Sequence, residues 1–230
     1  MSKGKLYGVG VGPGNPELLT VKAVRVIQES DVVAVPQAGA GEQAALAIAA
    51  EYIGDKPVLH CDMPMTRDRA ARDASHDRAA DTICALLDEG KTVAFLTLGD
   101  PSVYSTCWYV HRRVAARGYA VEMVPGVPSF CAAAAALGRA LCEDDEMLHI
   151  IPASHGALDA ALDLPGGKVL MKAGKAILEV RDRLAERGVL QNAALVERCG
   201  MKGERIVSEL DTLDDPTGYF SIILVKEDKA

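Results

Sequence analysis

The sequence predicts an α/β protein of two domains, the first built on a largely parallel sheet and the second on a mixed one. Strand and helix patterns alternate from residue 5 to about residue 137, and such alternation is typical of parallel sheets. Beyond that point strands follow one another with fewer helices between them, which indicates a mixed sheet. The 230 residues exceed the ~150 of a typical domain, so we place one domain over 1–124 and another over 125–230.

Apolar runs and helical spacings define the elements of the first half. Leu18, Val21, Val24 and Ile27 recur at threes, which predicts a helix that buries this face. Pro36 is expected to end the second strand, and the polar stretch 62–75 is expected to begin as a mobile loop. The expected strands are 5–11, 31–35, 57–61, 93–96 and 120–124, and the expected helices are 18–30, 42–52, 76–89, 105–117 and 129–137.

The second half contains more strands than helices. The expected strands are 147–151, 168–171, 193–197, 205–207 and 219–225, and the expected helices are 157–162 and 177–187.

Composition narrows the class of protein. A net charge of −7 argues against a general nucleic-acid binder, because phosphate neutralisation needs a basic surface. No run of 18 apolar residues and no signal-type N-terminus is present, so we expect a cytoplasmic protein without a membrane span. The six cysteines form no C-x-x-C pair, and we expect reduced thiols and no metal site: Cys61, Cys84, Cys107, Cys131, Cys142 and Cys199.

The glycine-rich start does not encode a dinucleotide site. Residues 8–14 read GVGVGPG after the first strand, but the G-x-G-x-x-G fingerprint fails, since its last position is Pro13 or Asn15. The second strand also lacks the terminal acidic residue that would bind a ribose. Gly8 and Gly10 instead indicate that other parts of the chain approach this strand closely.

The stretch 97–106, TLGDPSVYST, is the best candidate for a ligand-binding loop. It follows a buried strand and precedes a helix, and ligands of open α/β sheets bind at the carboxyl ends of strands. Asp100 and Tyr104 are the side chains in it that offer acid–base chemistry. Asp100 can also serve as a turn or capping carboxylate.

Four segments, in order along nearly the whole chain, resemble the signatures of the tetrapyrrole methylases, the class III S-adenosylmethionine-dependent methyltransferases. These segments are 10–20 (GVGPGNPELLT), 99–104 (GDPSVY), 125–129 (PGVPS), and 196–200 with 204–206 (VERCG, ERI). Within the family the second and third segments look most like the precorrin-2 C20-methyltransferases, including those that act on cobalt-factor II. The resemblance implies two α/β domains with an active-site trough between them, a homodimer, S-adenosylmethionine as methyl donor, and a role in cobalamin biosynthesis.

The resemblance also assigns site residues. It implies that Pro13 lines the adenosine, that Leu98, Gly99, Asp100 and Val103 hold the methionine portion, that Ser129 and Phe130 contact the tail or ribose, and that Met171 and Cys199 border the adenine. Relatives that methylate uroporphyrinogen III carry an acidic segment after the second strand. Here residues 35–38 read VPQA, so an acidic base cannot be transferred to this position.

The substrate that the resemblance implies carries many carboxylates, so an acidic protein must gather cations locally. The best candidates are Arg67, Arg69 and Arg72, as a lid; further candidates are Arg139, Lys172, Lys175 and Arg198. Tyr104, Asp100 and His60 are the candidates for the proton acceptor.

Other functions remain open from the sequence. The same family includes enzymes for other corrin positions, uroporphyrinogen III, diphthine and ribosomal RNA ribose, of which the RNA option conflicts with the negative charge. A non-catalytic nucleotide-binding or assembly module is the alternative from another class.

Overall fold

The computed structural model describes residues 3–37, 40–64, 66, 68–153 and 158–226, without the side chains of residues 40–43 and 175. The chain divides into two compact units, Met1–Pro128 and Ser129–Ala230. The expected start of the second domain, residue 125, lies in the segment that joins these units.

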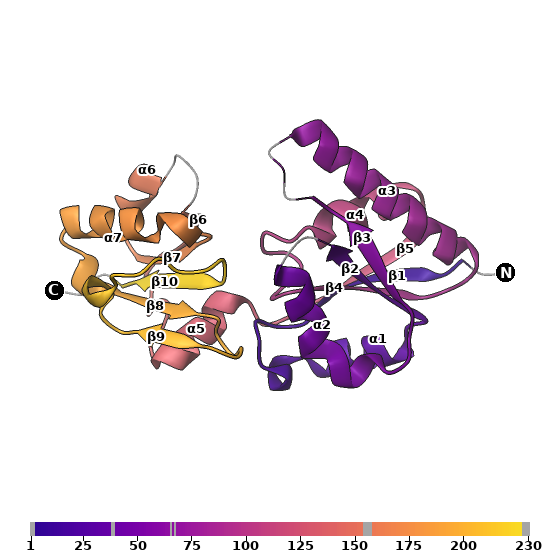
Figure 1. Cartoon of the computed structure of the whole chain (residues 1–230), viewed down its shortest axis with the longest axis horizontal. Helices are drawn as coiled ribbons and strands as arrows, with labels where there is room; N and C mark the ends of the chain where they lie inside the picture. Colours follow the sequence, from indigo (N-terminus) through magenta and orange to yellow (C-terminus); the bar gives the residue numbers. More distant parts are fainter. Residues whose placement is uncertain (1–2, 38–39, 65, 67, 154–157, 227–230) are drawn as a thin grey trace. The chain divides into compact units, whose positions relative to one another are not determined.

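The first unit is a five-stranded parallel sheet in the order β3-β2-β4-β1-β5 (Figure 1). Its strands are β1 (Lys5–Gly10), β2 (Val32–Gln37), β3 (Val58–Asp62), β4 (Val93–Thr97) and β5 (Ala120–Val124). Its helices are α1 (Val21–Glu29), α2 (Ala40–Ile53), α3 (Arg69–Asp88) and α4 (Cys107–Ala116), and a 3-10 turn covers Pro16–Leu18. β4 is buried along its whole length, as its continuous apolar sequence requires.

Helices cover both faces of this sheet. Side chains of α1 and α2 form one apolar cluster with the strands, and side chains of α3 and α4 form another (Figure 1). The face of α1 differs from the prediction: Ala23, Val26 and Ile27 are buried, whereas Val21 is 89% exposed. The helix begins only at Val21, where the Thr20 hydroxyl caps it by accepting a hydrogen bond from the Ala23 amide.

Two further expectations for the first unit are wrong. Pro36 does not end β2, which continues to Gln37 beside β3. The pairing of β2 with β4 stops at Ala34, so the missing amide of Pro36 costs no bond on that side. The helix expected from residue 76 starts earlier, at Arg69, where the Asp68 carboxylate caps α3.

The second unit is a five-stranded mixed sheet in the order β6-β7-β10-β8-β9. Its strands are β6 (Leu148–Pro152), β7 (Gly167–Met171), β8 (Ala193–Glu197), β9 (Arg205–Val207) and β10 (Ser221–Val225). Its helices are α5 (Ser129–Leu137), α6 (Leu158–Leu162) and α7 (Ile177–Glu186), with 3-10 turns at Gly174–Ala176, Leu190–Asn192 and Leu210–Thr212. The expected fold class, an α/β protein with one parallel and one mixed sheet, is confirmed.

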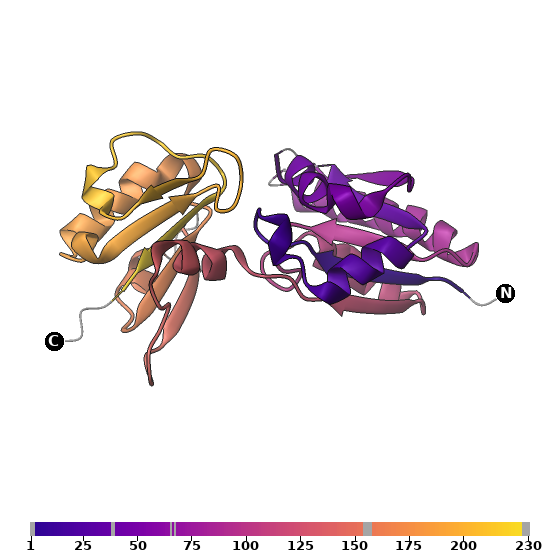
Figure 2. The ribbon, with the colours of Figure 1, turned by 90° about the horizontal axis from the view of Figure 1, so that it is seen from below.

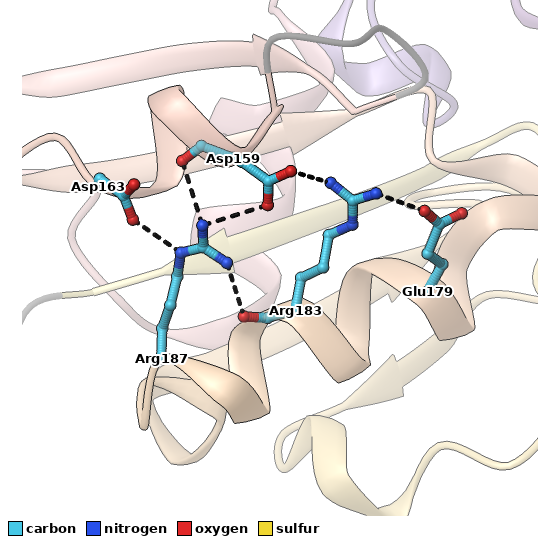
Figure 3. Close-up of polar contacts among 5 residues, drawn as sticks. All are labelled: Asp159, Asp163, Glu179, Arg183 and Arg187. Atoms are coloured by element: carbon cyan, nitrogen blue, oxygen red, sulfur yellow. Dashed lines mark hydrogen bonds and ion pairs between the residues drawn. The ribbon is translucent and has the colours of Figure 1, made fainter.

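Helices α6 and α7 lie on one face of the second sheet and α5 on the other (Figure 2). Exposed ion pairs join α6 to α7: Asp159 pairs with both Arg183 and Arg187, which also pair with Glu179 and Asp163 (Figure 3). These pairs are on the surface, and we assign them a structural role only.

Candidate active site

Three glycines meet at the carboxyl edge of the first sheet, and we call them the glycine junction: Gly10, Gly99 and Gly126. They follow or end β1, β4 and β5, which are neighbours in the sheet. A Cβ atom on Gly126 would lie 2.2 Å from the Gly99 carbonyl oxygen, and one on Gly10 would lie 2.6 Å from the same oxygen. Only glycine fits at these positions, which confirms that other parts of the chain approach β1 closely.

Backbone hydrogen bonds connect the loops after β1 and β4. The amides of Gly12 and Gly99 donate to each other's carbonyl oxygens at 3.2 and 2.8 Å. Both residues have positive φ angles, 76° and 70°, which glycine adopts at low cost. Pro13 is buried directly after this contact. The first and second signature segments therefore form one structural unit.

Asp100 connects the loops after β4 and β5. Its Oδ2 atom accepts a hydrogen bond from the Gly126 amide at 2.9 Å, and its Oδ1 atom accepts from the amide and the hydroxyl of Ser102. Both carboxylate oxygens are thus engaged within the protein, and charged acceptors of this kind make strong hydrogen bonds. The geometry favours a positioning role for Asp100 over direct proton transfer.

The start of α4 is fixed by a hydroxyl that the sequence analysis did not single out. The Ser105 hydroxyl lies 2.8 Å from the Thr97 hydroxyl and accepts a hydrogen bond from the Cys107 amide at 3.1 Å. Between these anchors, Tyr104 has a φ of 48° and is 47% exposed. A bulky residue in this conformation is strained, and such strain often occurs at functional loops. A serine two residues before an apolar helical run was the signal that could have identified Ser105.

The three loops offer a ligand a negative surface. Residues 10–20, 97–106 and 124–130 contain no lysine or arginine, whereas Asp100 contributes a carboxylate. S-adenosylmethionine carries positive charge on its sulfonium and ammonium groups, so acceptor groups without competing cations suit it. The residues present therefore fit the methyl donor that the resemblance implies.

The other four candidates for cofactor binding lie in the second unit. Ser129 and Phe130 begin α5. Met171 ends β7 and pairs with Ile222 of β10, while Cys199 follows the end of β8. Since β7 and β8 both run antiparallel to β10, their carboxyl ends reach the same edge of this sheet. Burial and the nearby Glu204 carboxylate raise the pKa of Cys199 to about 11, so its thiol stays protonated at neutral pH.

The arginines proposed as a lid lie in or near the first turn of α3. Arg69 is its first residue and lies 3.8 Å from the Asp73 carboxylate, and the side chain of Arg72 is exposed. The third arginine, Arg67, lies outside the described residues, as does the side chain of Lys175. The two described arginines follow the carboxyl end of β3, so they belong to the same edge of the sheet as the glycine junction.

Comparison with known proteins identifies the class. The family of tetrapyrrole (corrin/porphyrin) methylases matches residues 5–214, and the chain belongs to this family. The expectation from the signature segments is confirmed. In the described part of the chain no helix is long and apolar enough to cross a membrane.

Three curated relatives are similar along nearly the whole chain. The cobalt-precorrin-2 C(20)-methyltransferase of Salmonella typhimurium is 33% identical, covering 97% of each chain. The precorrin-2 C(20)-methyltransferase of a Sinorhizobium species is 32% identical, covering 96% of this chain and 95% of the relative. The cobalamin biosynthesis protein CobIJ of Mycobacterium tuberculosis is 36% identical over 97% of this chain. The chain spans about half of that longer protein, 46% of its length.

Among solved structures, that of a cobalt precorrin-4 methyltransferase matches with a TM-score of 0.77, covering 96% of this chain and 94% of the other. At 23% sequence identity this likeness shows the fold.

Proposed function

We propose that this enzyme methylates C20 of precorrin-2 or cobalt-factor II in corrin biosynthesis. The observation that carries the proposal is the pair of relatives with this activity in their names, one for the metal-free and one for the cobalt form. Each covers the chain almost from end to end. The glycine junction and Asp100 add a loop arrangement suited to the methyl donor.

Alignment of the donor and acceptor is the main task of the residues in this reaction. When bound, S-adenosylmethionine supplies an electrophilic methyl group on a positively charged sulfur, and this charge disappears as the new carbon–carbon bond forms. Strong charge stabilisation is therefore not required, and correct orientation can contribute about 7–11 kcal/mol to the acceleration. The glycine junction fixes the loops, and Asp100 holds the loop after β5 against the loop after β4.

We assign the remaining residues as follows. In the first unit Pro13, Leu98, Gly99, Asp100 and Val103 bind the donor, and in the second Ser129, Phe130, Met171 and Cys199 do so. Tyr104 and His60 are the remaining candidates for accepting the proton from the methylated carbon, since both oxygens of Asp100 are engaged. Arg67, Arg69 and Arg72 bind carboxylates of the substrate, and the enzyme acts as a homodimer.

A methyl-transfer assay tests this function. Purified enzyme is incubated with methyl-labelled S-adenosylmethionine and either precorrin-2 or cobalt-factor II, and the product is analysed by mass spectrometry and NMR. We expect one labelled methyl at C20 and S-adenosylhomocysteine as co-product. A methyl at another ring position, or transfer only to uroporphyrinogen III, would contradict the proposal. Absence of S-adenosylmethionine binding in calorimetry would contradict enzymatic activity altogether.

A further inference from the structure

Two long cationic residues leave their strands in the left-handed backbone conformation at one edge of the second sheet. Lys172 follows β7 with a φ of 60°, and Arg198 follows β8 with a φ of 55°. In the described part of the chain only four residues other than glycine have positive φ angles. This conformation costs roughly 1–2 kcal/mol for a residue with a side chain. Glycine or asparagine would fit more easily, so the two cations occupy positions that backbone preference does not explain.

The sheet topology places these two residues side by side. β10 lies between β7 and β8 and pairs with both, through Met171 with Ile222 and Glu197 with Ser221. The Arg198 amide continues this pairing by donating to the Phe220 carbonyl at 2.8 Å. Neighbouring strands are ~4.8 Å apart, so the Cα atoms of Lys172 and Arg198 are separated by about 10 Å.

Nearby acidic groups do not account for Arg198. The adjacent Glu197 carboxylate accepts a hydrogen bond from the Gly218 amide at 2.6 Å and lies 3.5 Å from Nε of Arg205. Arg198 itself is exposed, and among the described residues it forms no ion pair. Its guanidinium group is therefore available to an anionic ligand, and arginine binds carboxylates in a bidentate manner.

Two aromatic residues directly precede β10, the strand between the two cations. Phe220 directly precedes β10 and forms an edge-to-face pair with Tyr219, with ring centroids 5.3 Å apart. Tyr219 is 51% exposed, so part of this aromatic surface faces solvent. Burial lowers the pKa of Lys172. Exposed aromatic surface at the start of the strand that separates two cations suits a flat ring system that carries acidic groups on its rim.

We propose that Lys172 and Arg198, here called the cationic pair, bind two carboxylates about 10 Å apart on the rim of the macrocyclic substrate. This inference rests on the proposed function, because it takes a polycarboxylate tetrapyrrole as the ligand. It adds substrate-recognition residues from the second unit to the arginines of α3. The donor-binding loops of the first unit lack cations and are unsuited to this task.

Substitutions to asparagine test the cationic pair without disturbing the backbone. Asparagine tolerates positive φ angles, so Lys172→Asn and Arg198→Asn remove the charge and keep the turn. We expect each to raise the KM for the tetrapyrrole about tenfold, as loss of a charged hydrogen bond predicts, with KM for S-adenosylmethionine within twofold. Lys172→Arg and Arg198→Lys should restore most of the affinity. The matched control is Lys202→Asn, an exposed lysine of the same loop.

A binding measurement separates this inference from the proposed reaction. Uroporphyrin III, a stable macrocycle with eight carboxylates, is titrated into each variant, and S-adenosylhomocysteine is titrated by calorimetry. We expect the asparagine variants to bind uroporphyrin about tenfold more weakly and S-adenosylhomocysteine normally. If the variants bind as expected but the enzyme does not methylate C20, the cationic pair is supported and the proposed function is contradicted. Unchanged macrocycle binding and KM would overturn the inference even if C20 is methylated. Weakened binding of S-adenosylhomocysteine alone would also overturn it and reassign the pair to the donor.

Discussion

The edges where we propose ligand binding differ in the residues that adopt positive φ angles, although Tyr104 at the first edge and Gly200 at the second depart from this contrast. In the first unit Gly12 and Gly99 adopt them, and the glycine junction permits backbone-to-backbone contact. In the second unit Lys172 and Arg198 adopt them and retain long charged side chains. At the first edge the glycines therefore determine how closely the backbones of the loops approach one another. The second is a place where the strained residues offer side-chain chemistry.

This difference separates the two demands of methyl transfer. A cationic donor needs a rigid surface free of positive charge, and loops 10–20 and 97–106 provide it. A polycarboxylate acceptor needs cations, and these follow β7, β8 and β3. Substitutions in the glycine junction should therefore affect mainly the donor, and substitutions of Lys172 and Arg198 mainly the macrocycle, which the following predictions examine.

The largest effect is expected for Gly126→Ala in the glycine junction. The new methyl group would lie 2.2 Å from the Gly99 carbonyl oxygen, so the loops after β4 and β5 must separate. We expect loss of S-adenosylmethionine binding in calorimetry and a loss of stability of about 1–3 kcal/mol in urea denaturation. The matched control is Gly54→Ala, at a φ of 60° with nothing within 4 Å. Gly54→Ala should lower the free energy of unfolding by about 1 kcal/mol, because alanine is strained at this φ, and it should bind the donor normally. Normal donor binding by Gly126→Ala would refute the junction's role.

Asp100→Asn should weaken donor binding with less loss of stability. The amide group of asparagine cannot accept hydrogen bonds at both of its ends, so either Gly126 or Ser102 loses its partner. We expect about a tenfold rise in Kd for S-adenosylhomocysteine, measured by calorimetry, and a smaller change in KM for the tetrapyrrole. Ser102→Ala, which removes one hydroxyl only, is the control. A larger effect on the tetrapyrrole would place Asp100 at the substrate.

The arginines at the start of α3 test whether the first unit also recognises the substrate. Replacing Arg67, Arg69 and Arg72 together by alanine should raise the KM for the tetrapyrrole several-fold, because exposed charges contribute modestly. The KM for S-adenosylmethionine should not change. Arg25→Ala, an exposed arginine of α1, serves as control. Unchanged kinetics of the triple variant would confine substrate recognition to the second unit.

Mild acid should destabilise the first unit before the second. His111 is buried in α4 and its Nε2 atom has no partner among the described residues. Burial lowers its pKa in the folded chain, so the unfolded chain binds the proton first as pH falls. The contribution of His111 to the free energy of unfolding is fully present above about pH 6.5. It decreases below that pH, by up to about 1.4 kcal/mol per pH unit. Urea denaturation at pH 7.5, 6.5 and 5.5 should show a flatter dependence for His111→Phe, and an equal slope would contradict this.

The smallest effect is expected for Asp159→Asn in the ion pairs between α6 and α7 (Figure 3). These groups are exposed, and water and salt screen them. We expect the melting temperature to fall by no more than about 2 °C and the difference to vanish in 1 M salt. Activity and ligand affinities should be unchanged. A large loss of activity would mean that this surface takes part in function.

Several features of the site could be predicted from the sequence and others could not. The turn composition of 97–106 after a buried strand indicated a ligand loop, and the close approach at Gly10 followed from glycine in a strand. The hydrogen bond from the Gly126 amide to the Asp100 carboxylate could not be predicted, because the two residues are 26 positions apart in the chain. The buried face of α1 was assigned wrongly, since Val21 opens the helix and the true apolar stripe starts at Ala23.

By itself, the sequence determined the fold class, the order of the elements and the family, because these depend on local periodicity and on short signature segments. Only the tertiary structure decided which distant residues meet. It placed Gly10, Gly99 and Gly126 in one contact, and Lys172 beside Arg198 across β10. The physical reason is that such contacts depend on strand pairing and register, which non-local packing fixes and residue spacing does not encode.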